Sequence, residues 1–363
     1  MLIQKTIDAS GYDDFDGHEN IVYFEDDATG LQAIIGVHNS NLGPSFGGCR
    51  IHNYVKFEDA ITDVLRLSKG MTYKSAMAGL PLGGGKAVII ADAKTDKSVD
   101  KMRSFGDAVE AMAGSYITAE DVGSTDADMI TISEVTSYVS GLPKKENALG
   151  GNPSPYTAKG VFYGMRAGLN SALGTQSFDG VHVVVKGLGA VGYDLCRYLD
   201  KEGAKLTVTD INQAVLRKAQ EEFRNVTVVD PISAHEVACD ILAPCALGGS
   251  INPQTIPDIK AKLIAGAANN QLQNKLQGQR LHDKGVIYAP DYVVNAGGII
   301  AVGYEYFSYN GNNPFDHEMT QKTLTGHISR IEGTTRDLLV RSKDDNQPAG
   351  DVADRMAEEI FLK

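Results

Sequence analysis

The chain has 363 residues, a length that predicts about two domains. Hydrophobic residues make up 42% and charged residues 22%, which is ordinary globular usage and excludes wholesale disorder. The formal net charge of −12 disfavours nucleic acid and anionic membrane surfaces as partners, because both attract basic proteins.

Targeting and redox signals favour a cytoplasmic protein. The first twenty residues hold one lysine, many acids and no apolar run, so we expect no signal peptide. No stretch approaches the roughly 18 consecutive apolar residues of a membrane span. The cysteines lack zinc-ligand spacing and are expected to be buried thiols, so no metal is expected. They are Cys49, Cys196, Cys239 and Cys245.

The first half of the chain is predicted to combine strands with helices. Its elements are, in order, a strand pair at 21–24 and 31–39, a helix at 57–72, a strand at 86–91, a helix at about 98–113 and a strand at 116–120. A glycine-rich turn is expected just before the strand at 86–91. Residues 143–155 are dense in proline, glycine and asparagine, which indicates a linker and a domain boundary.

The second half predicts a doubly wound α/β domain. A helix over 157–173 is followed by helices alternating with short apolar strands at 181–185, 205–210, 226–230, 239–244, 261–267 and 285–290. Such alternation indicates a parallel sheet covered on both faces. A final helix carries an apolar stripe that needs a partner, either the first domain or a neighbouring subunit. The stripe comprises Val352, Met356, Ile360 and Leu362.

A dinucleotide-binding fingerprint follows the strand at 181–185. The glycines of Gly187-Leu-Gly189-Ala-Val-Gly192 suit a tight turn, an approaching pyrophosphate and close helix packing. Asp210 ends the next strand, 18 residues after Gly192, where a carboxylate can accept both ribose hydroxyls and would repel the 2′-phosphate of NADP. NAD is therefore favoured. The alternative is a ligand-free turn with Asp210 as a helix N-cap.

The first half carries the candidate acid–base residues. Lys74 closes the first helix, and Lys86 follows three glycines at the start of an apolar strand, a setting suited to proton exchange. The glycine run is no phosphate-binding Walker loop, because Leu80 and Ala87 stand where glycine and a hydroxyl residue are needed. Asp121 follows a strand end, where open α/β sheets bind ligands. Surface lysines and a loop carboxylate remain the alternative.

Several motifs in order resemble the Glu/Leu/Phe/Val amino-acid dehydrogenase family. They are Leu42-Gly-Pro-Ser-Phe-Gly-Gly-Cys-Arg50, Gly70-Met-Thr-Tyr-Lys74, Leu80-Pro-Leu-Gly-Gly-Gly-Lys86, Ile117-Thr-Ala-Glu-Asp-Val-Gly123, Cys239-Asp-Ile-Leu-Ala-Pro-Cys-Ala-Leu-Gly248, Ala267-Ala-Asn-Asn-Gln271 and Tyr288-Ala-Pro-Asp-Tyr-Val-Val-Asn-Ala-Gly-Gly298. The Ala119-Glu120 pair and the segment Asn152-Pro-Ser-Pro155 make the pattern most similar to family members that act on leucine.

The resemblance implies two α/β domains with a cleft between them. Residues 1–148 would form the substrate-binding, catalytic and oligomerisation domain, and 149–334 the Rossmann dinucleotide-binding domain. The C-terminal helix, about 335–363, would pack back on the first domain. The implied reaction is reversible NAD-dependent oxidative deamination of leucine and related branched-chain L-amino acids to 2-oxo acids and ammonia, in a homo-oligomer.

The resemblance also implies individual roles. Lys74, assisted by Asn270, would bind the substrate carboxylate; Lys86 would act through water as general base; Asp121 would hold the amino group and exchange protons with it. Further substrate-binding residues would be Leu42, Gly43, Ala119, Ile299 and Val302. The cofactor would contact Thr157, Gly187, Leu188, Gly189, Ala190, Val191, Gly192, Asp210 and Asn270.

The substrate side chain stays open to alternatives. The apolar residues among those implied for the pocket fit a branched aliphatic chain and would leave a glutamate carboxylate unpaired, at a cost of several kcal/mol. An aromatic amino-acid dehydrogenase of the same family is one alternative. A catalytically silent NAD-binding sensor is another, disfavoured by the joint presence of Lys74, Lys86 and Asp121.

Overall fold

The computed structural model describes residues 1–143 and 149–363, which divide into two compact units. The first unit comprises residues 1–152, 301–321 and 357–363, and the second comprises 153–300 and 322–356. Residues 301–321, which the sequence assignment placed in the second domain, thus belong to the first unit. Part of the predicted linker, residues 144–148, lies outside the described residues.

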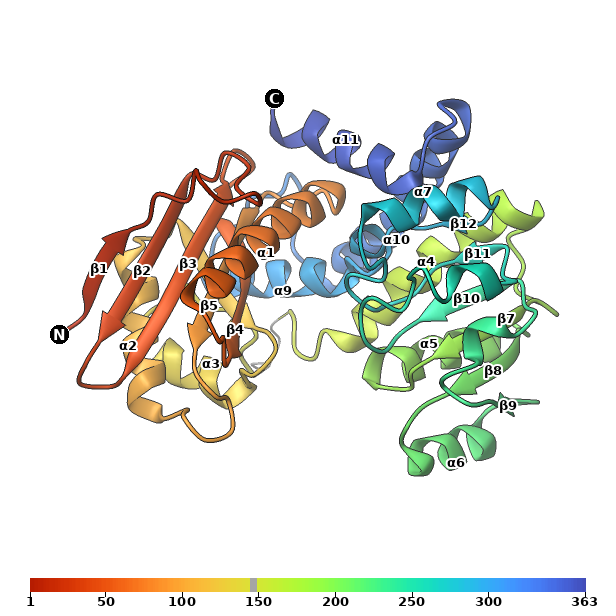
Figure 1. The fold of residues 1–363 in the computed structure, drawn as a ribbon, viewed down its shortest axis with the longest axis horizontal. Coiled ribbons are helices and arrows are strands. Elements are labelled where there is room, and N and C mark those ends of the chain that lie inside the picture. Colours follow the sequence, from red (N-terminus) through yellow and green to blue (C-terminus); the bar gives the residue numbers. More distant parts are fainter. Residues whose placement is uncertain (144–148) are drawn as a thin grey trace. The chain divides into compact units, whose positions relative to one another are not determined.

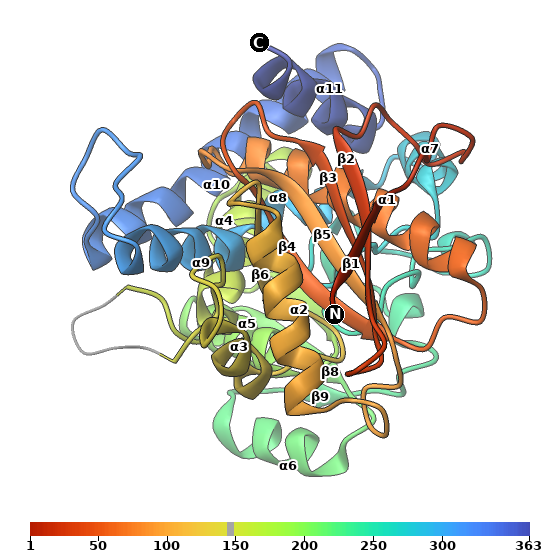
Figure 2. The same cartoon turned by 90° about the vertical axis from the view of Figure 1, so that its left-hand side faces the viewer.

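The first unit is built on a six-stranded mixed sheet, in the order β1-β2-β3-β5-β4-β6 (Figures 1 and 2). Its strands are β1 (Ile3–Thr6), β2 (Asn20–Asp26), β3 (Leu31–Asn39), β4 (Ser45–His52), β5 (Gly83–Ile90) and β6 (Tyr116–Glu120). The pairs from β1 to β5 are antiparallel, whereas β4 runs parallel to both β5 and β6. The carboxyl ends of three strands therefore meet at one edge.

Helices cover both faces of this sheet, as Figures 1 and 2 show. The helices are α1 (Phe57–Met77) on one face and α2 (Val99–Ala111) with α3 (Asp126–Ser133) on the other. Alternate strand residues feed the two cores: Ile34 and Val88 pack with α1, while Ile35 and Ile89 pack with α2. The hairpin and the helices at 57–72 and 98–113 are thereby confirmed.

The glycine-rich turn expected before Lys86 is wrong. Gly83–Gly85 are the first residues of β5 and pair with both β3 and β4. These glycines are needed for close packing: a Cβ on Gly84 would lie 2.1 Å from the backbone nitrogen of Thr72 on α1. Lys86 therefore lies inside a buried strand and has no flexible backbone beside it.

The second unit is an all-parallel, doubly wound sheet in the order β12-β11-β10-β7-β8-β9. Its strands are β7 (His182–Lys186), β8 (Lys205–Thr209), β9 (Thr227–Val228), β10 (Ile241–Pro244), β11 (Leu263–Ile264) and β12 (Ile287–Tyr288). All six were expected from the sequence, although the outer strands are shorter than predicted. This order, reversing at β7 and β10, is that of a Rossmann dinucleotide-binding domain.

Helices also cover both faces of the second sheet. They are α4 (Ser154–Leu173), α5 (Ala190–Lys201), α6 (Gln213–Glu222), α7 (Lys275–Asp283), α8 (Asp291–Val294) and α10 (Gln321–Asp344). Val183 and Val185 point into the core formed with α4 and α5, and Val184 points into the opposite core. The helix α9 (Gly297–Tyr309) starts in this unit and ends in the first.

The last helix, α11 (Ala349–Phe361), buries a different stripe from the one predicted. Val352 is buried as expected, but Ile360 and Leu362 are exposed and Met356 is half-buried. Alanines fill the contact instead, together with Phe361, whose ring packs 5.3 Å from that of Tyr73. The final residues of the chain thus pack against α1 within the first unit.

Candidate active site

The centre of the first unit's polar cluster is an ion pair between Lys86 and Asp121. The Nζ atom of Lys86 lies 2.9 Å from Oδ2 of Asp121. Lys86 points to the α1 face of the sheet, since its neighbour Ala87 packs on the α2 face. Its side chain is 6% exposed, so the ammonium has little water and depends on the carboxylate.

Asp121 is placed by a turn at the carboxyl end of β6. Its backbone N–H donates to Oγ of Ser124 at 2.8 Å, and that hydroxyl lies 2.9 Å from the carbonyl oxygen of Cys49. Close approach of β4 requires glycine here, because a Cβ on Gly48 would lie 2.8 Å from Cβ of Asp121. The glycines of the first motif thus let the aspartate reach the lysine.

The charge state of Asp121 follows from its surroundings. Burial by itself would raise the pKa of the carboxyl, but attraction to Lys86 and Arg50 outweighs burial and holds the pKa below its ordinary value. The adjacent Glu120 behaves in the opposite way. Burial and the nearby carboxylates of Asp126 and Asp128 raise its pKa to about 7. Neighbouring carboxylates therefore hold different charges near neutral pH.

The other predicted residues of the first unit surround the same strands. Lys74 is half-buried in the last turn of α1, the helix that covers the Lys86 face. Ala119 is buried on β6 beside Gly48 of β4. Leu42 and Gly43 are half-buried in the loop before β4, where the Gly43 carbonyl accepts a hydrogen bond from the start of β5.

Val302 joins this group through α9. Its carbonyl oxygen accepts a hydrogen bond from Oγ of Ser140, and the backbone N–H of Ser140 donates to the carbonyl oxygen of Thr118 on β6. The buried carboxylate of Glu305, one turn further along α9, accepts backbone N–H groups from Gly141, Leu142 and Gly151. These bonds fix α9 beside the strand that leads to Asp121.

Sequence reasoning gave no role to three residues that contact the ion pair or its neighbours. Arg50 donates from Nε to Oδ2 of Asp121 at 3.2 Å and from a terminal nitrogen to Asp63 at 2.9 Å. The hydroxyl of Tyr54 donates to Asp63 at 2.5 Å. The available signal was an arginine inside the strand motif Gly47-Gly-Cys-Arg50, since a charge in a buried strand needs a partner.

In the second unit, the predicted loop lies between β7 and α5. Gly187 has φ +108°, and a Cβ on Gly192 would lie 2.1 Å from the carbonyl oxygen of Gly187, so only glycines fit this turn. Gly189 is the N-cap of α5 and has no side chain to cap the helix. A Cβ there would meet open space. Leu188 is buried, while Ala190 is exposed and Val191 half-buried.

This loop fits the pyrophosphate of a dinucleotide. The uncapped first turn of α5 offers backbone N–H groups and the positive end of the helix to an anion. Asp210 lies at the same place, because its Oδ2 accepts the Leu188 N–H at 2.7 Å. It is no helix N-cap: Asn212 caps α6 by accepting from Ala214. The N-cap role that the alternative gave to Asp210 is therefore wrong.

The remaining residues predicted in this unit lie on neighbouring segments. Asn270 is exposed after β11 with φ +51°, and its carbonyl oxygen accepts the Gly249 N–H at 2.7 Å. Thr157 lies in the first turn of α4, beside Gly298 at the start of α9. Ile299 follows and is buried. All three lie within the second unit, as does the glycine loop.

No three histidine, cysteine or acidic side chains of the described residues are grouped so that they could hold a metal ion. None of the helices in the described ranges is long and apolar enough to span a bilayer.

Known proteins with similar sequences define the class. Residues 18–138 match the family model described as Glu/Leu/Phe/Val dehydrogenase, dimerisation domain. Residues 152–354 match Glutamate/Leucine/Phenylalanine/Valine dehydrogenase. Together they make the chain an oxidoreductase of the amino-acid dehydrogenase type, a class that depends on a pyridine nucleotide.

Individual relatives of the chain are amino-acid dehydrogenases as well. The chain is 49% identical to leucine dehydrogenase of Geobacillus stearothermophilus and 48% identical to that of Bacillus subtilis, covering 94% of this chain and 90% and 91% of those proteins. The crystal structure of L-tryptophan dehydrogenase from Nostoc punctiforme is similar with a TM-score of 0.82 at 39% identity, over 95% of this chain and 96% of that one. The chain belongs to the Glu/Leu/Phe/Val dehydrogenase family.

Proposed function

We propose that the protein catalyses reversible, NAD-dependent oxidative deamination of L-leucine and related branched-chain L-amino acids to 2-oxo acids and ammonia. The observation that carries the proposal is the ion pair between Lys86, buried inside β5, and Asp121, which directly follows the carboxyl end of β6. The identity of nearly half to two leucine dehydrogenases supports the substrate class.

The two members of the ion pair divide the acid–base work. Asp121 stays anionic because its pKa is lowered, so it can hold the substrate's amino group and exchange protons with it. Lys86 acts through a water molecule as general base, and its ammonium form stabilises the carbinolamine and the developing carbonyl. Burial of Lys86 strengthens these interactions, since little water competes for it.

The substrate carboxylate needs a separate cation. We assign this role to Lys74, assisted by Asn270, whose amide can donate a hydrogen bond. Lys74 comes from α1, which covers the face of the sheet to which Lys86 points. A lysine for the carboxylate and a lysine for proton transfer orient the amino acid by both ends of its backbone.

The side chain of the substrate is assigned to Leu42, Gly43, Ala119, Ile299 and Val302. None of them carries a charge or a polar side-chain group. A branched aliphatic chain gains burial there, while a glutamate carboxylate would lose its water without a partner. The Gly43 and Ala119 positions add little side-chain bulk, so the larger apolar residues set the length of chain accepted.

The cofactor is assigned to the glycine loop and the residues near it. The pyrophosphate would be held by the loop residues Gly187, Leu188, Gly189, Ala190, Val191 and Gly192, and the ribose hydroxyls would be accepted by Asp210. Thr157 and Asn270 would also contact the cofactor. The carboxylate of Asp210 disfavours a 2′-phosphate, which supports NAD over NADP. When bound, the nicotinamide ring supplies the acceptor for the hydride that leaves the substrate Cα.

Assembly and location belong to the same proposal. The family model matched by the first unit is described as a dimerisation domain, and β1 forms an exposed sheet edge, which supports a homo-oligomer. All four cysteines are free, which supports a reducing, cytoplasmic location. Mass measurement of the native protein in solution tests the assembly.

A steady-state assay tests the activity. Absorbance of reduced nicotinamide is followed with a panel of L-amino acids, with NAD and with NADP, at mildly alkaline pH. We expect activity on leucine, isoleucine and valine with NAD. Preference for phenylalanine or tryptophan would overturn the pocket assignment and favour the aromatic alternative. Binding of NAD without any amino-acid-dependent reduction would overturn the enzymatic proposal and favour a sensor.

A further inference from the structure

Asp121 is held by two cations on the same oxygen atom. Lys86 approaches Oδ2 from β5 at 2.9 Å, and Arg50 approaches it from β4 at 3.2 Å. A carboxylate with a single partner can rotate about its side-chain bonds. Two donors from neighbouring strands of one sheet restrict that rotation, because the strands themselves are paired.

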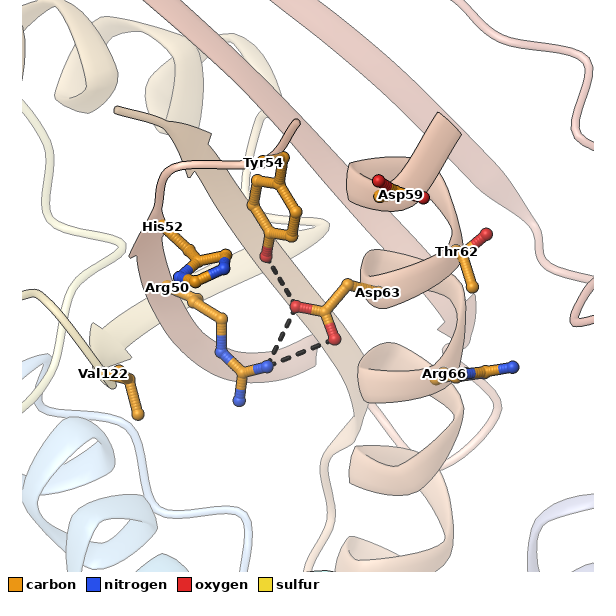
Figure 3. Close-up of a pocket in the computed structure, with 8 residues that line it drawn as sticks. All are labelled: Arg50, His52, Tyr54, Asp59, Thr62, Asp63, Arg66 and Val122. Carbon is orange, nitrogen blue, oxygen red and sulfur yellow. Dashed lines mark hydrogen bonds and ion pairs between the residues drawn. The ribbon is translucent and has the colours of Figure 1, made fainter. Parts of the chain in front are cut away.

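Arg50 is itself fixed from the opposite side. One terminal nitrogen donates to both carboxylate oxygens of Asp63, at 3.2 and 2.9 Å, and Tyr54 donates to Asp63 at 2.5 Å (Figure 3). Asp63 comes from α1 and Tyr54 from the segment between β4 and α1. The guanidinium is therefore held between two carboxylates in one orientation, which suits a planar, always charged group.

These residues line a hollow of about 570 Å³ in the first unit. Arg50, Tyr54 and Asp63 form one part of its lining, and Arg66 forms another part (Figure 3). Arg66 pairs with Asp14 at 2.8 Å, so it has a partner of its own outside the Asp121 cluster. The hollow thus contains one arginine bonded to Asp121 and another bonded elsewhere.

We propose that Arg50, held by Asp63 and Tyr54, is a positioning residue that fixes the Asp121 carboxylate for the substrate's amino group. The inference deepens the proposed dehydrogenase function and rests on it. Arg50 acts through Asp121 and is given no contact with the substrate. Since Asp121 is assigned to the amino group and Lys74 to the carboxylate, loss of Arg50 affects one end of the substrate more than the other.

The electrostatic setting agrees with this role. Attraction to Lys86 and Arg50 lowers the pKa of Asp121 against the effect of burial, so both cations favour the anion that an ammonium group would need. Cys49, Tyr54, Tyr116 and Glu120 also interact electrostatically with this carboxylate, and none of these four groups is a cation.

The reverse reaction separates the two ends of the substrate, because ammonia and the 2-oxo acid are added as distinct reactants. We expect Arg50→Met to lower kcat/KM for ammonia roughly tenfold to a hundredfold, with kcat/KM for 4-methyl-2-oxopentanoate changed less than about threefold. Arg50→Lys should recover part of the loss, since lysine restores the positive charge but not the planar set of guanidinium donors. Arg66→Met is the matched control and should behave as the wild type.

Milder variants keep the test decisive if Arg50→Met fails to fold. Asp63→Asn and Tyr54→Phe keep Arg50 but weaken the hydrogen bonds that fix its guanidinium. Both should lower kcat/KM for ammonia, by a smaller factor than Arg50→Met does. Equal losses for ammonia and oxo acid, or values equal to those of Arg66→Met, would overturn the positioning role while the dehydrogenase function stands. A wild type without amino-acid-dependent activity would overturn both.

Discussion

The two units differ in the polar groups that their predicted sites offer. In the first unit these groups are side chains: Lys86, Asp121 and Arg50 form ion pairs inside and beside a buried sheet. In the second unit they belong to the backbone, because the loop at Gly187–Gly192 offers N–H groups and an uncapped helix end. A charged network is disturbed by removing a charge, whereas a glycine loop is disturbed by adding a single methyl group.

Under the proposed function, this difference would separate proton transfer at the substrate from cofactor binding. Phosphates are similar in every dinucleotide, so backbone groups suffice to bind them. Proton transfer at the substrate needs groups with particular charge states, and these arise from side chains in particular surroundings. Substitutions in the Lys86–Asp121 ion pair should therefore lower kcat without changing the affinity for NAD. Substitutions in the Gly187–Gly192 loop should lower the affinity for NAD with less effect on kcat.

The largest effect is expected for Lys86→Met. Loss of the general base should lower kcat roughly 100- to 10,000-fold, while the dissociation constant for NAD stays at the wild-type value. Steady-state rates measure kcat, and quenching of tyrosine fluorescence during titration with NAD measures the dissociation constant. Lys101→Met is the matched control: Lys101 is also a buried lysine of the first unit, paired with Asp96 on the α2 side. A kcat within threefold of wild type for Lys86→Met, or equal loss in both variants, contradicts the assignment.

Gly189→Ala in the second unit should weaken NAD binding, the quantity that Lys86→Met leaves unchanged. A Cβ at Gly189 meets open space, so the variant should fold with an unchanged thermal midpoint. The methyl group would stand where the pyrophosphate approaches, and the dissociation constant for NAD should rise roughly tenfold to a hundredfold. Gly326→Ala on α10, where a Cβ also meets open space, is the control. Unchanged NAD binding in Gly189→Ala would exclude the loop as the phosphate site.

Asp210→Ala should change the choice of cofactor. Without the carboxylate, NAD loses a partner for its ribose hydroxyls and NADP loses a repulsion, so the NAD-to-NADP ratio of kcat/KM should fall at least about tenfold. Asp230→Ala is the matched control, because Asp230 accepts the N–H two residues ahead just as Asp210 does. An NAD-to-NADP ratio of kcat/KM that stays at the wild-type value in both variants would show that Asp210 does not bind the ribose hydroxyls.

The smallest expected effect concerns stability at Glu120. Its pKa in the folded protein is raised to about 7, so its contribution to stability is present below its unfolded pKa and is lost as the pH rises through about 7. Glu120→Gln removes the repulsion from Asp126 and Asp128. Its thermal midpoint should exceed that of the wild type near about pH 8, and the gain should shrink toward about pH 5. A gain independent of pH would contradict this origin.

Much of the fold was predictable because strands and helices alternate with clear periodicity. The parallel strands of the second unit were all expected, and so was the turn at Gly187–Gly192. The glycines before Lys86 were misread, since glycine signals a turn in isolation but here serves close packing of α1 on β5. The stripe of α11 was misplaced for a related reason: alanines form its contact surface, and bulk alone pointed to Ile360 and Leu362.

Site residues that belong to a sequence motif could be predicted, whereas contacts that arise only from tertiary packing could not. Lys86 and Asp121 came from separate motifs, and the structure brings their side chains within 2.9 Å. The hold on Arg50 by Asp63 joins two elements, β4 and α1, and no local pattern in either signals the pairing. Side-chain networks of this kind depend on tertiary packing, which single-sequence periodicity does not describe.

Hydride transfer from an amino acid to NAD by this chain can be followed with L-leucine deuterated at Cα. One turnover with NAD is followed by mass spectrometry of the nicotinamide product, of the 2-oxo acid and of released ammonia. We expect one deuterium on the reduced cofactor, with equal amounts of 4-methyl-2-oxopentanoate and ammonia. Reduced cofactor without deuterium, or no reduction while NAD remains bound, would contradict it.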